Sequence, residues 1–335
     1  MRDFMKKYIN EFKVGETFYD VVLAIKNKRF GKTRDKKDYL DLQFADKTGE
    51  VGAKVWQDNL SMCENIEIGD IVSVNGVIEE YNNVIQIKIK SFSKVEDFDV
   101  ADFVIQTDKN IEEMYESLLK IIKAIKNKPL KLFLENVFYD EEFSQKFKKS
   151  PGAERIHHAC LGGLLVHVNE MCNLAKVFIK EYPDLNFDLL YAGILLHDIG
   201  KIRELGVKTF IYRTVEGSLL GHLMIGSMWV NDLLNKEKDF PKGLKNELLH
   251  LIVSHHGFLE FGSPILPKTQ EAVCLHYLDN ISSKVNLAYN VTAEYKSTSD
   301  VFSQFNRVLG TDLYISENFD DISNTPKPKN LTLGI

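Results

Sequence analysis

The sequence predicts an α+β chain of two domains, in which a small N-terminal β-barrel is followed by an all-α domain. Between residues 14 and 92, short runs of alternating apolar and polar residues are separated by turn residues, which is typical of strands. From Ile111 onward, apolar residues recur at spacings of three and four, which indicates amphipathic helices. All nine histidines lie between His157 and His276. Because histidine is the commonest metal ligand and acid–base residue near neutral pH, we expect the chemistry in the second domain.

The N-terminal pattern predicts five short strands, at residues 17–25, 39–45, 51–56, 71–79 and 84–91. Five strands of this length fit a small closed barrel. The segment from Phe44 to Trp56 (FADKTGEVGAKVW) resembles a hairpin of the OB-fold. A generic five-stranded sheet is the alternative.

We expect residues 1–93 to form the barrel and the acidic, irregular residues 94–110 to form a linker. Residues 111–316 then form the helical domain, and residues 317–335 form an irregular tail that contains Pro326 and Pro328. Within the helical domain, the periodicity predicts helices at 129–137, 141–149, 155–181, 187–198, 218–236, 243–255 and 268–289.

The composition is that of an ordinary globular protein, with 44% hydrophobic and 27% charged residues among 335. The net charge of −6 means that any contact with nucleic acid must come from a local basic patch. The four cysteines form no CxxC pair, so we expect reduced thiols rather than disulfides or a cysteine zinc site. The first residues lack the apolar segment of a signal peptide, and no apolar run approaches the ~18 residues of a membrane span. We therefore expect a cytoplasmic protein with no membrane contact.

An apolar helix is predicted to end in the motif LLHDIGK, from Leu195 to Lys201. A histidine and an aspartate side by side at a buried helix end are costly to bury unpaired, and a divalent cation removes that cost. Taken alone, the pair is better explained as a satisfied core histidine at a helix end. The pair is accompanied by further polar residues on other predicted helices, namely His167, His222, His255, His256 and Asp279.

The order His, His-Asp, His, His-His, Asp resembles the HD-domain superfamily of metal-dependent phosphohydrolases. The resemblance implies that the core metal ligands are His167, His197, Asp198 and Asp279. It further implies that His222, His255 and His256 complete a two-metal site in which Asp198 bridges both ions. Lys201 matches a lysine that many members place near the phosphate; a helix-end lysine is the alternative. Val168 departs from the family, since many relatives have Ser or Thr there.

The first domain contains a basic segment, residues 26–37, with seven cations, one acid and one aromatic residue. We expect this segment to be a loop after the first strand that binds single-stranded nucleic acid, because OB-folds combine basic grooves with aromatic stacking surfaces. A solvated basic hairpin is the alternative. Its candidate contact residues are Lys26, Lys28, Arg29, Phe30, Lys32, Arg34, Lys36 and Lys37.

For the other aromatic residues and histidines, we predict a position or a role one by one. Tyr39 and Tyr81 are candidate stacking surfaces, whereas we expect Phe44 and Trp56 in the core. His157 and His158 are candidates for lining a substrate channel. For His250 and His276 we expect no role in catalysis, only core or surface positions.

An OB-fold followed by an HD domain resembles the YhaM family of bacterial 3′→5′ exoribonucleases. The motifs that carry this resemblance are HHACLGGLLVH at 157–167, LLHDIGK at 195–201, SHHGFLEFGSP at 254–264 and HYLDN at 276–280. The resemblance implies removal of nucleotides from the 3′ end of single-stranded RNA, and often DNA, by metal-activated water. It also implies two divalent ions, with Mn²⁺ favoured and Fe or Mg as alternatives, and self-association into a homo-oligomer.

Two other functions compete with this one. The first is an HD phosphohydrolase that acts on a free nucleotide or a cyclic dinucleotide, with a regulatory barrel. The second is a nucleic-acid-binding regulator with a degenerate HD site. The complete ligand set argues against the regulator, and the basic aromatic segment argues against the small-molecule enzyme.

Overall fold

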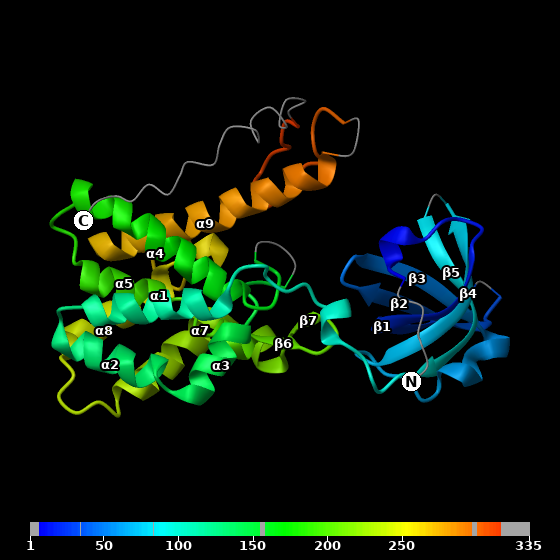
Figure 1. The fold of residues 1–335 in the computed structure, drawn as a ribbon, viewed down its shortest axis with the longest axis horizontal. Coiled ribbons are helices and arrows are strands. Elements are labelled where there is room, and N and C mark those ends of the chain that lie inside the picture. The colour runs from blue at the N-terminus through cyan, green and yellow to red at the C-terminus, as the bar shows by residue number, and fades with distance from the viewer. Residues whose placement is uncertain (1–6, 34, 83, 155–157, 297–299, 316–335) are drawn as a thin grey trace.

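The computed structural model describes residues 7–33, 35–82, 84–154, 158–296 and 300–315. Arg34, His157 and the predicted tail at 317–335 lie outside the described residues. Figure 1 shows a β-barrel joined to a body of helices, as the sequence predicts. No helix in these described ranges combines the length and the apolar character needed to cross a membrane.

The barrel consists of five strands that close in the order β1-β2-β3-β5-β4, which is the strand order of an OB-fold. The prediction of a five-stranded OB-type barrel is therefore confirmed. Its strands are β1 (Thr17–Lys32), β2 (Asp38–Asp46), β3 (Gly49–Trp56), β4 (Ile71–Tyr81) and β5 (Val84–Lys94). Two short 3₁₀ helices accompany them, η1 (Ile9–Glu11) and η2 (Gln57–Cys63).

Strand β1 closes the barrel because it pairs with β4 along its first half and with β2 along its second half. Its register shifts between Phe18 and Val21 and again between Ile25 and Asn27, and such bulges bend a strand around a barrel corner. The barrel interior is filled by side chains such as Leu23, Phe44 and Ile78, which are fully buried.

Two expectations for this domain were wrong. The basic segment is not a loop throughout, because β1 continues to Lys32 and pairs with β2 as far as Asp38, so the segment belongs to a hairpin, which was the alternative. Trp56 is not in the core, since 52% of it is exposed, whereas Phe44 is buried as expected. The alternation along β3 explains the exposure of Trp56, because Val51, Ala53 and Val55 face inward and leave Trp56 on the outer face.

The helical domain contains nine α-helices, counted over the described residues. They are α1 (Ile111–Ala124), α2 (Lys128–Phe138), α3 (Glu141–Lys149), α4 (Gly163–Glu181), α5 (Phe187–Leu196), α6 (Lys201–Glu204), α7 (Val215–Leu234), α8 (Lys242–Ser254) and α9 (Gln270–Tyr295). Side chains of Asn, Asp or Thr accept hydrogen bonds at the start of six of them, as helix caps do, at Asn110, Asn127, Asp140, Asn186, Thr214 and Thr269.

Two features of this domain differ from the prediction. The helix expected to begin at residue 155 begins at Gly163, after Gly162 takes a left-handed conformation with φ of 80°. The domain is also not purely helical, because a short hairpin of β6 (Leu205–Val207) and β7 (Ile211–Arg213) follows α6.

Helix α5 lies at the centre of the helical domain and packs against α2, α4, α8 and α9. Its residues from Leu189 to Leu196 are buried except for the partly buried Tyr191. A helix that is apolar on all sides is stable only when other elements cover all of it. The chain leaves this helix at His197 and Asp198, so that both residues are inside the domain.

The β6–β7 hairpin lies between the helical body and the barrel (Figure 1). Val207 and Ile211 of the hairpin pack against a buried cluster that contains Ala24 and Ile71 of the barrel. The buried Thr209 at its turn donates a hydrogen bond of 3.3 Å from Oγ1 to the carbonyl oxygen of Gly69. The segment expected to be an irregular linker joins the same contact, through the buried Phe103 and Val104 and the short 3₁₀ helix η3 (Val100–Asp102).

Candidate metal centre

Two groups of metal-ligand side chains come together where four helices and the end of α5 meet. The first group contains His167 of α4, His197 at the end of α5, and Asp279 of α9. The second group is His222 of α7 with the adjacent residues His255 and His256, which follow α8. Asp198 belongs with His197 and His255 and so connects the two groups.

The first group is compact and buried. The Nε2 atom of His167 lies 3.2 Å from Nε2 of His197 and 3.2 Å from Oδ1 of Asp279. The Nε2 atom of His197 in turn lies 3.2 Å from Oδ2 of Asp198. These four side chains therefore direct nitrogen and oxygen atoms toward one point.

The second group lies on the other side of Asp198. The Nε2 atoms of His222 and His256 are 3.2 Å apart. Oδ1 of Asp198 lies 3.4 Å from Nε2 of His222 and 3.7 Å from Nε2 of His255. One oxygen of Asp198 thus faces each group, which is the placement expected of a carboxylate that bridges two ions.

Each of the five histidines is held at Nδ1 by an oxygen atom. Since a neutral imidazole carries one N–H, an acceptor at Nδ1 leaves the lone pair on Nε2, the atom that each ring directs at the centre. The partners are Ile194 O for His197 at 2.9 Å, Ile252 O for His255 at 2.7 Å, Phe261 O for His256 at 2.7 Å, Ser282 Oγ for His167 at 3.0 Å and Glu204 Oε2 for His222 at 3.0 Å.

These residues fit divalent cations. Oδ1 of Asp198 is buried and accepts no hydrogen bond from a described residue, which is costly for a carboxylate oxygen. Converging Nε2 lone pairs repel one another unless a cation lies between them. Imidazole nitrogen and carboxylate oxygen are both good ligands for divalent transition metals.

Lys201 extends from the first turn of α6 to Asp198, with Nζ 2.6 Å from Oδ2. Burial by itself lowers the pKa of a lysine, but the neighbouring Asp198 carboxylate outweighs it and raises the pKa of Lys201. For Asp198, burial favours the protonated form, but Lys201 and His197 hold its pKa well below the usual range. The pair is therefore an ammonium and a carboxylate at neutral pH.

Glycines allow the close backbone approach on which the centre depends. A Cβ atom at Gly200 would lie 2.1 Å from the carbonyl oxygen of His222, so the Asp198–Lys201 turn packs directly against α7. Gly257, with φ of 79°, passes close to the ring of His276. His276 is buried, as expected, and its Nδ1 lies 2.8 Å from the carbonyl oxygen of His255.

Three residues that hold the histidines were not found by sequence reasoning: Glu204, Ser282 and Glu170. Ser282 contacts Nδ1 of His167 and donates a hydrogen bond of 3.0 Å to Oε2 of Glu170. Ser282 and Glu170 lie three residues after a candidate ligand on the same helix, and Glu204 lies three residues after Lys201. That spacing places them on the ligand-bearing face and is the feature by which they could be found.

His158, a candidate for lining a substrate channel, lies beside the first group of ligands. It is buried, with Nε2 3.2 Å from Oε2 of Glu170 and its ring 5.4 Å from the ring of His167. Burial behind His167 leaves little of His158 for contact with a substrate.

Some cations of the basic segment form ion pairs or hydrogen bonds with other residues of the barrel. Lys26 forms an ion pair with Glu50, and Lys32 pairs with Asp38 at 3.3 Å. Nζ of Lys28 donates hydrogen bonds to the carbonyl oxygens of Cys63 and Ile66, at 3.0 and 2.8 Å, so it supports the end of η2. The exposed members are Arg29, Phe30, Lys32, Lys36 and Lys37.

Two adjoining hollows cross the outer face of the barrel and share Lys54 and Gln86. The one of about 320 Å³ is lined by Arg29 of β1, and the one of about 210 Å³ by Trp56 of β3 and Lys88 of β5. The rings of Tyr39 and Trp56 lie 5.9 Å apart, and Nζ of Lys54 lies 5.1 Å from the Tyr39 ring centre. This surface, which we call the barrel groove, combines cations with the exposed Trp56 ring and the partly buried Tyr39 ring. Two of its cations are paired with acids that line the same hollows, Lys54 with Asp41 at 3.8 Å and Lys88 with Glu79 at 3.3 Å.

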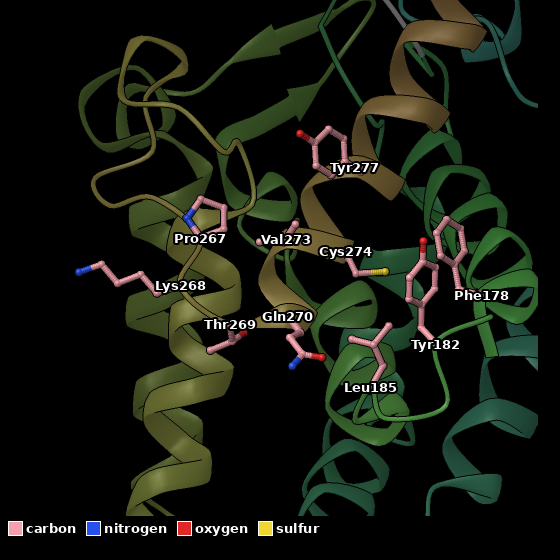
Figure 2. A pocket seen from close by; sticks show the side chains of 10 residues that line it. All are labelled: Phe178, Tyr182, Leu185, Pro267, Lys268, Thr269, Gln270, Val273, Cys274 and Tyr277. Carbon is pink, nitrogen blue, oxygen red and sulfur yellow. The ribbon is translucent and has the colours of Figure 1, made fainter. Parts of the chain in front are cut away.

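A different hollow, of about 580 Å³, lies between the end of α4 and the start of α9 (Figure 2). Phe178 and Tyr182 line one side of it, and the sulfur of Cys274 points toward Tyr182, while Lys268 points away. None of the candidate metal ligands lines this hollow. It is therefore separate from the metal centre.

Comparison with known proteins supports the assignment of both domains. Residues 164–284 match the model of the HD domain, a range that contains every candidate metal ligand, and residues 21–95 match an OB-fold nucleic acid binding domain. The 3′-5′ exoribonuclease YhaM of Geobacillus sp. (strain WCH70) is 37% identical over 291 residues, which cover 84% of this chain and 87% of that protein. The chain belongs to the YhaM family.

Two solved structures each align with part of this YhaM-family chain. One is a domain of replication protein A from Methanococcus maripaludis, which is 17% identical in sequence and has a TM-score of 0.24. The alignment covers 28% of this chain and 97% of that chain. The other is the second OB-fold domain of replication protein A from the same organism, with 20% identity, 28% and 98% covered, and a TM-score of 0.21.

Glu204 provides a test of how this YhaM-family centre is held together. We expect Glu204→Gln to weaken the binding of divalent ions by about 10- to 100-fold, because the neutral amide holds the His222 ring less firmly than the carboxylate does. Calorimetric titration of metal-stripped protein with Mn²⁺ measures this. Glu216→Gln is the matched control, since Glu216 pairs with Arg203 on the surface. Equal affinities for the two variants would contradict a positioning role for Glu204.

Proposed function

We propose that this protein is a metal-dependent 3′→5′ exoribonuclease that hydrolyses the phosphodiester bonds of single-stranded RNA, and also of single-stranded DNA. The proposal is supported by membership of the YhaM family, in which a relative of 37% identity carries that name. The observation on which it rests most is Asp198, whose two oxygens face two separate groups of histidines.

We assign one ion to His167, His197, Asp198 and Asp279, and a second to His222, His255, His256 and Asp198. Mn²⁺ is the proposed ion, with Fe or Mg as alternatives. Five imidazole nitrogens favour Mn or Fe over Mg, which prefers oxygen ligands. When bound, two such ions neutralise the charge of the phosphate, activate a water molecule and stabilise the leaving oxygen.

The chain itself contributes position and charge to the reaction. The oxygen atoms at Nδ1 fix the tautomer and the direction of every histidine ring, so the ligands need little rearrangement. Lys201 keeps Asp198 ionised and adds a positive charge beside the site of the phosphate. We therefore propose Asp198 and Lys201 as the residues on which turnover depends most.

The barrel is the proposed binding surface for the strand ahead of the reacting end. Arg29, Lys54 and Lys88 attract the phosphate backbone, and Trp56 and Tyr39 offer faces on which bases stack without regard to sequence. Phe30, Lys36 and Lys37 are exposed near the tip of the β1–β2 hairpin and extend this surface.

We also propose that the protein self-associates, as the family resemblance implies, and that it acts in the cytoplasm. An exposed apolar row on α9 supports association, with its members four residues apart: Val273, Tyr277, Ile281, Val285 and Tyr289. The unpaired thiols of the described cysteines suit a reducing compartment.

Removal of the bridging carboxylate tests the enzymatic proposal. Metal chemistry contributes several kcal/mol of transition-state stabilisation, so Asp198→Ala should slow hydrolysis about a thousandfold or more while RNA still binds. The assay uses 5′-labelled single-stranded RNA with Mn²⁺, and wild type should give a ladder of shortened labelled products.

Asp184→Ala, at an exposed aspartate away from the centre, is the control and should keep wild-type activity. Mononucleotides and cyclic dinucleotides are assayed in parallel. Cleavage of those alone would favour the small-molecule phosphohydrolase, and RNA binding without turnover in any metal would favour the regulator. Near-normal turnover by Asp198→Ala would make the metal assignment wrong.

The salt dependence of RNA binding tests the barrel surface. We expect replacement of Arg29, Lys36 and Lys37 by Ala to flatten the plot of log affinity against log salt, by about 0.7 for each phosphate that the protein no longer neutralises. Filter binding with the inactive Asp198→Ala background measures the slope. Replacing three exposed lysines of the helical domain, Lys120, Lys123 and Lys242, is the matched control. An unchanged slope in the barrel variant would remove these residues from the RNA surface.

A further inference from the structure

The chain exposes three large apolar side chains directly after the candidate ligand His256. Phe258 is 48% exposed, Leu259 is 64% exposed and Phe261 is 56% exposed. Single exposed apolar residues are common on protein surfaces, but three within four residues beside a candidate metal ligand are not. We call residues 257–263 the aromatic loop.

The aromatic loop is held in one conformation by hydrogen bonds and ring contacts. Its 3₁₀ helix η4 (Leu259–Phe261) closes with bonds from Phe261 N to Phe258 O at 3.1 Å and from Gly262 N to Leu259 O at 3.0 Å. The Phe258 ring packs edge-on against the buried His276, with 5.5 Å between the ring centres. The exposed side chains therefore belong to a loop with a defined conformation.

The aromatic loop is also tied to the metal centre. The carbonyl oxygen of Phe261 lies 2.7 Å from Nδ1 of His256, and Nε2 of His256 lies 3.2 Å from that of His222. Both histidines are partly exposed, whereas His167 and His197 are buried. The loop thus adjoins the more accessible of the two groups.

We propose that the ring of Phe261, supported by Phe258, stacks on a nucleobase near the 3′ end of the RNA while the scissile phosphate lies at the metal centre. This inference rests on the proposed function. A nucleobase has an apolar face that stacks on an aromatic ring regardless of its sequence, which suits an enzyme that removes any nucleotide. The exposed Glu260, which lies between Phe258 and Phe261 in the sequence, carries a carboxylate that repels phosphate, so the loop suits a base better than the backbone.

The test compares RNA that has a full set of bases with RNA that carries one abasic nucleotide at the first, second or third position from the 3′ end. For wild type, kcat/KM should fall about 5- to 150-fold with the abasic site at one of these positions, which corresponds to the removal of one base–aromatic stack. Phe261→Ala should cleave intact RNA more slowly and be insensitive to the same abasic site. Phe261→Trp should restore the sensitivity.

Phe305→Ala is the control, because Phe305 is 66% exposed and lies outside the loop and the centre. It should keep the wild-type ratio, and Mn²⁺ content should be equal in all variants. The proposal is overturned if Phe261→Ala keeps the wild-type sensitivity to the abasic site. If light scattering of that variant then also shows a smaller assembly, the loop contacts another copy of the chain instead of a base.

The outcome for wild type separates this inference from the proposed function. If wild type cleaves intact and abasic RNA at the same rate, only the role of the aromatic loop is wrong. If wild type cleaves no RNA at all, the proposed function itself is wrong.

Discussion

The helical domain depends on the burial of one carboxylate, Asp198, between two groups of histidines. Burying a charge is costly unless opposite charges and hydrogen bonds compensate for it, and Lys201 compensates only one of the two oxygens. The other oxygen faces His222 and His255 and accepts no hydrogen bond from a residue that the structure describes, and bound cations would make this arrangement favourable. The fully apolar helix α5 brings that carboxylate to the middle of the domain.

The same constraint explains how much the sequence could predict. Metal ligands are restricted to a few residue types, so His197-Asp198 and the distant histidines stand out against apolar helices. Their order along the chain also matches the order of the ligands in the HD superfamily. Glu204, Ser282 and Glu170 do not stand out, because any single polar residue on a helix is more often a surface residue. Their roles depend on which face of the helix meets the ligand, and tertiary packing decides that.

In the barrel, the strands could be predicted from the sequence, but the conformation of the basic segment and the exposure of Trp56 could not. Its strands follow from alternation, yet the basic segment has the composition of a loop because it is poor in apolar residues. Backbone pairing with β2 is enough to continue β1 there, and the Lys28 ammonium finds carbonyl partners at the end of η2. A large aromatic residue such as Trp56 favours the core, although its position in the alternation of β3 places it outside. Alternation outweighs side-chain size in a strand with one face buried.

The central claim is that Asp198 holds two metal ions, one at each oxygen. Anomalous diffraction from crystals of the protein grown with Mn²⁺ tests this most directly. The account predicts two peaks, one beside Oδ2 of Asp198 among His167, His197 and Asp279, and one beside Oδ1 among His222, His255 and His256. A single peak, or two peaks that lie away from these residues, would contradict it.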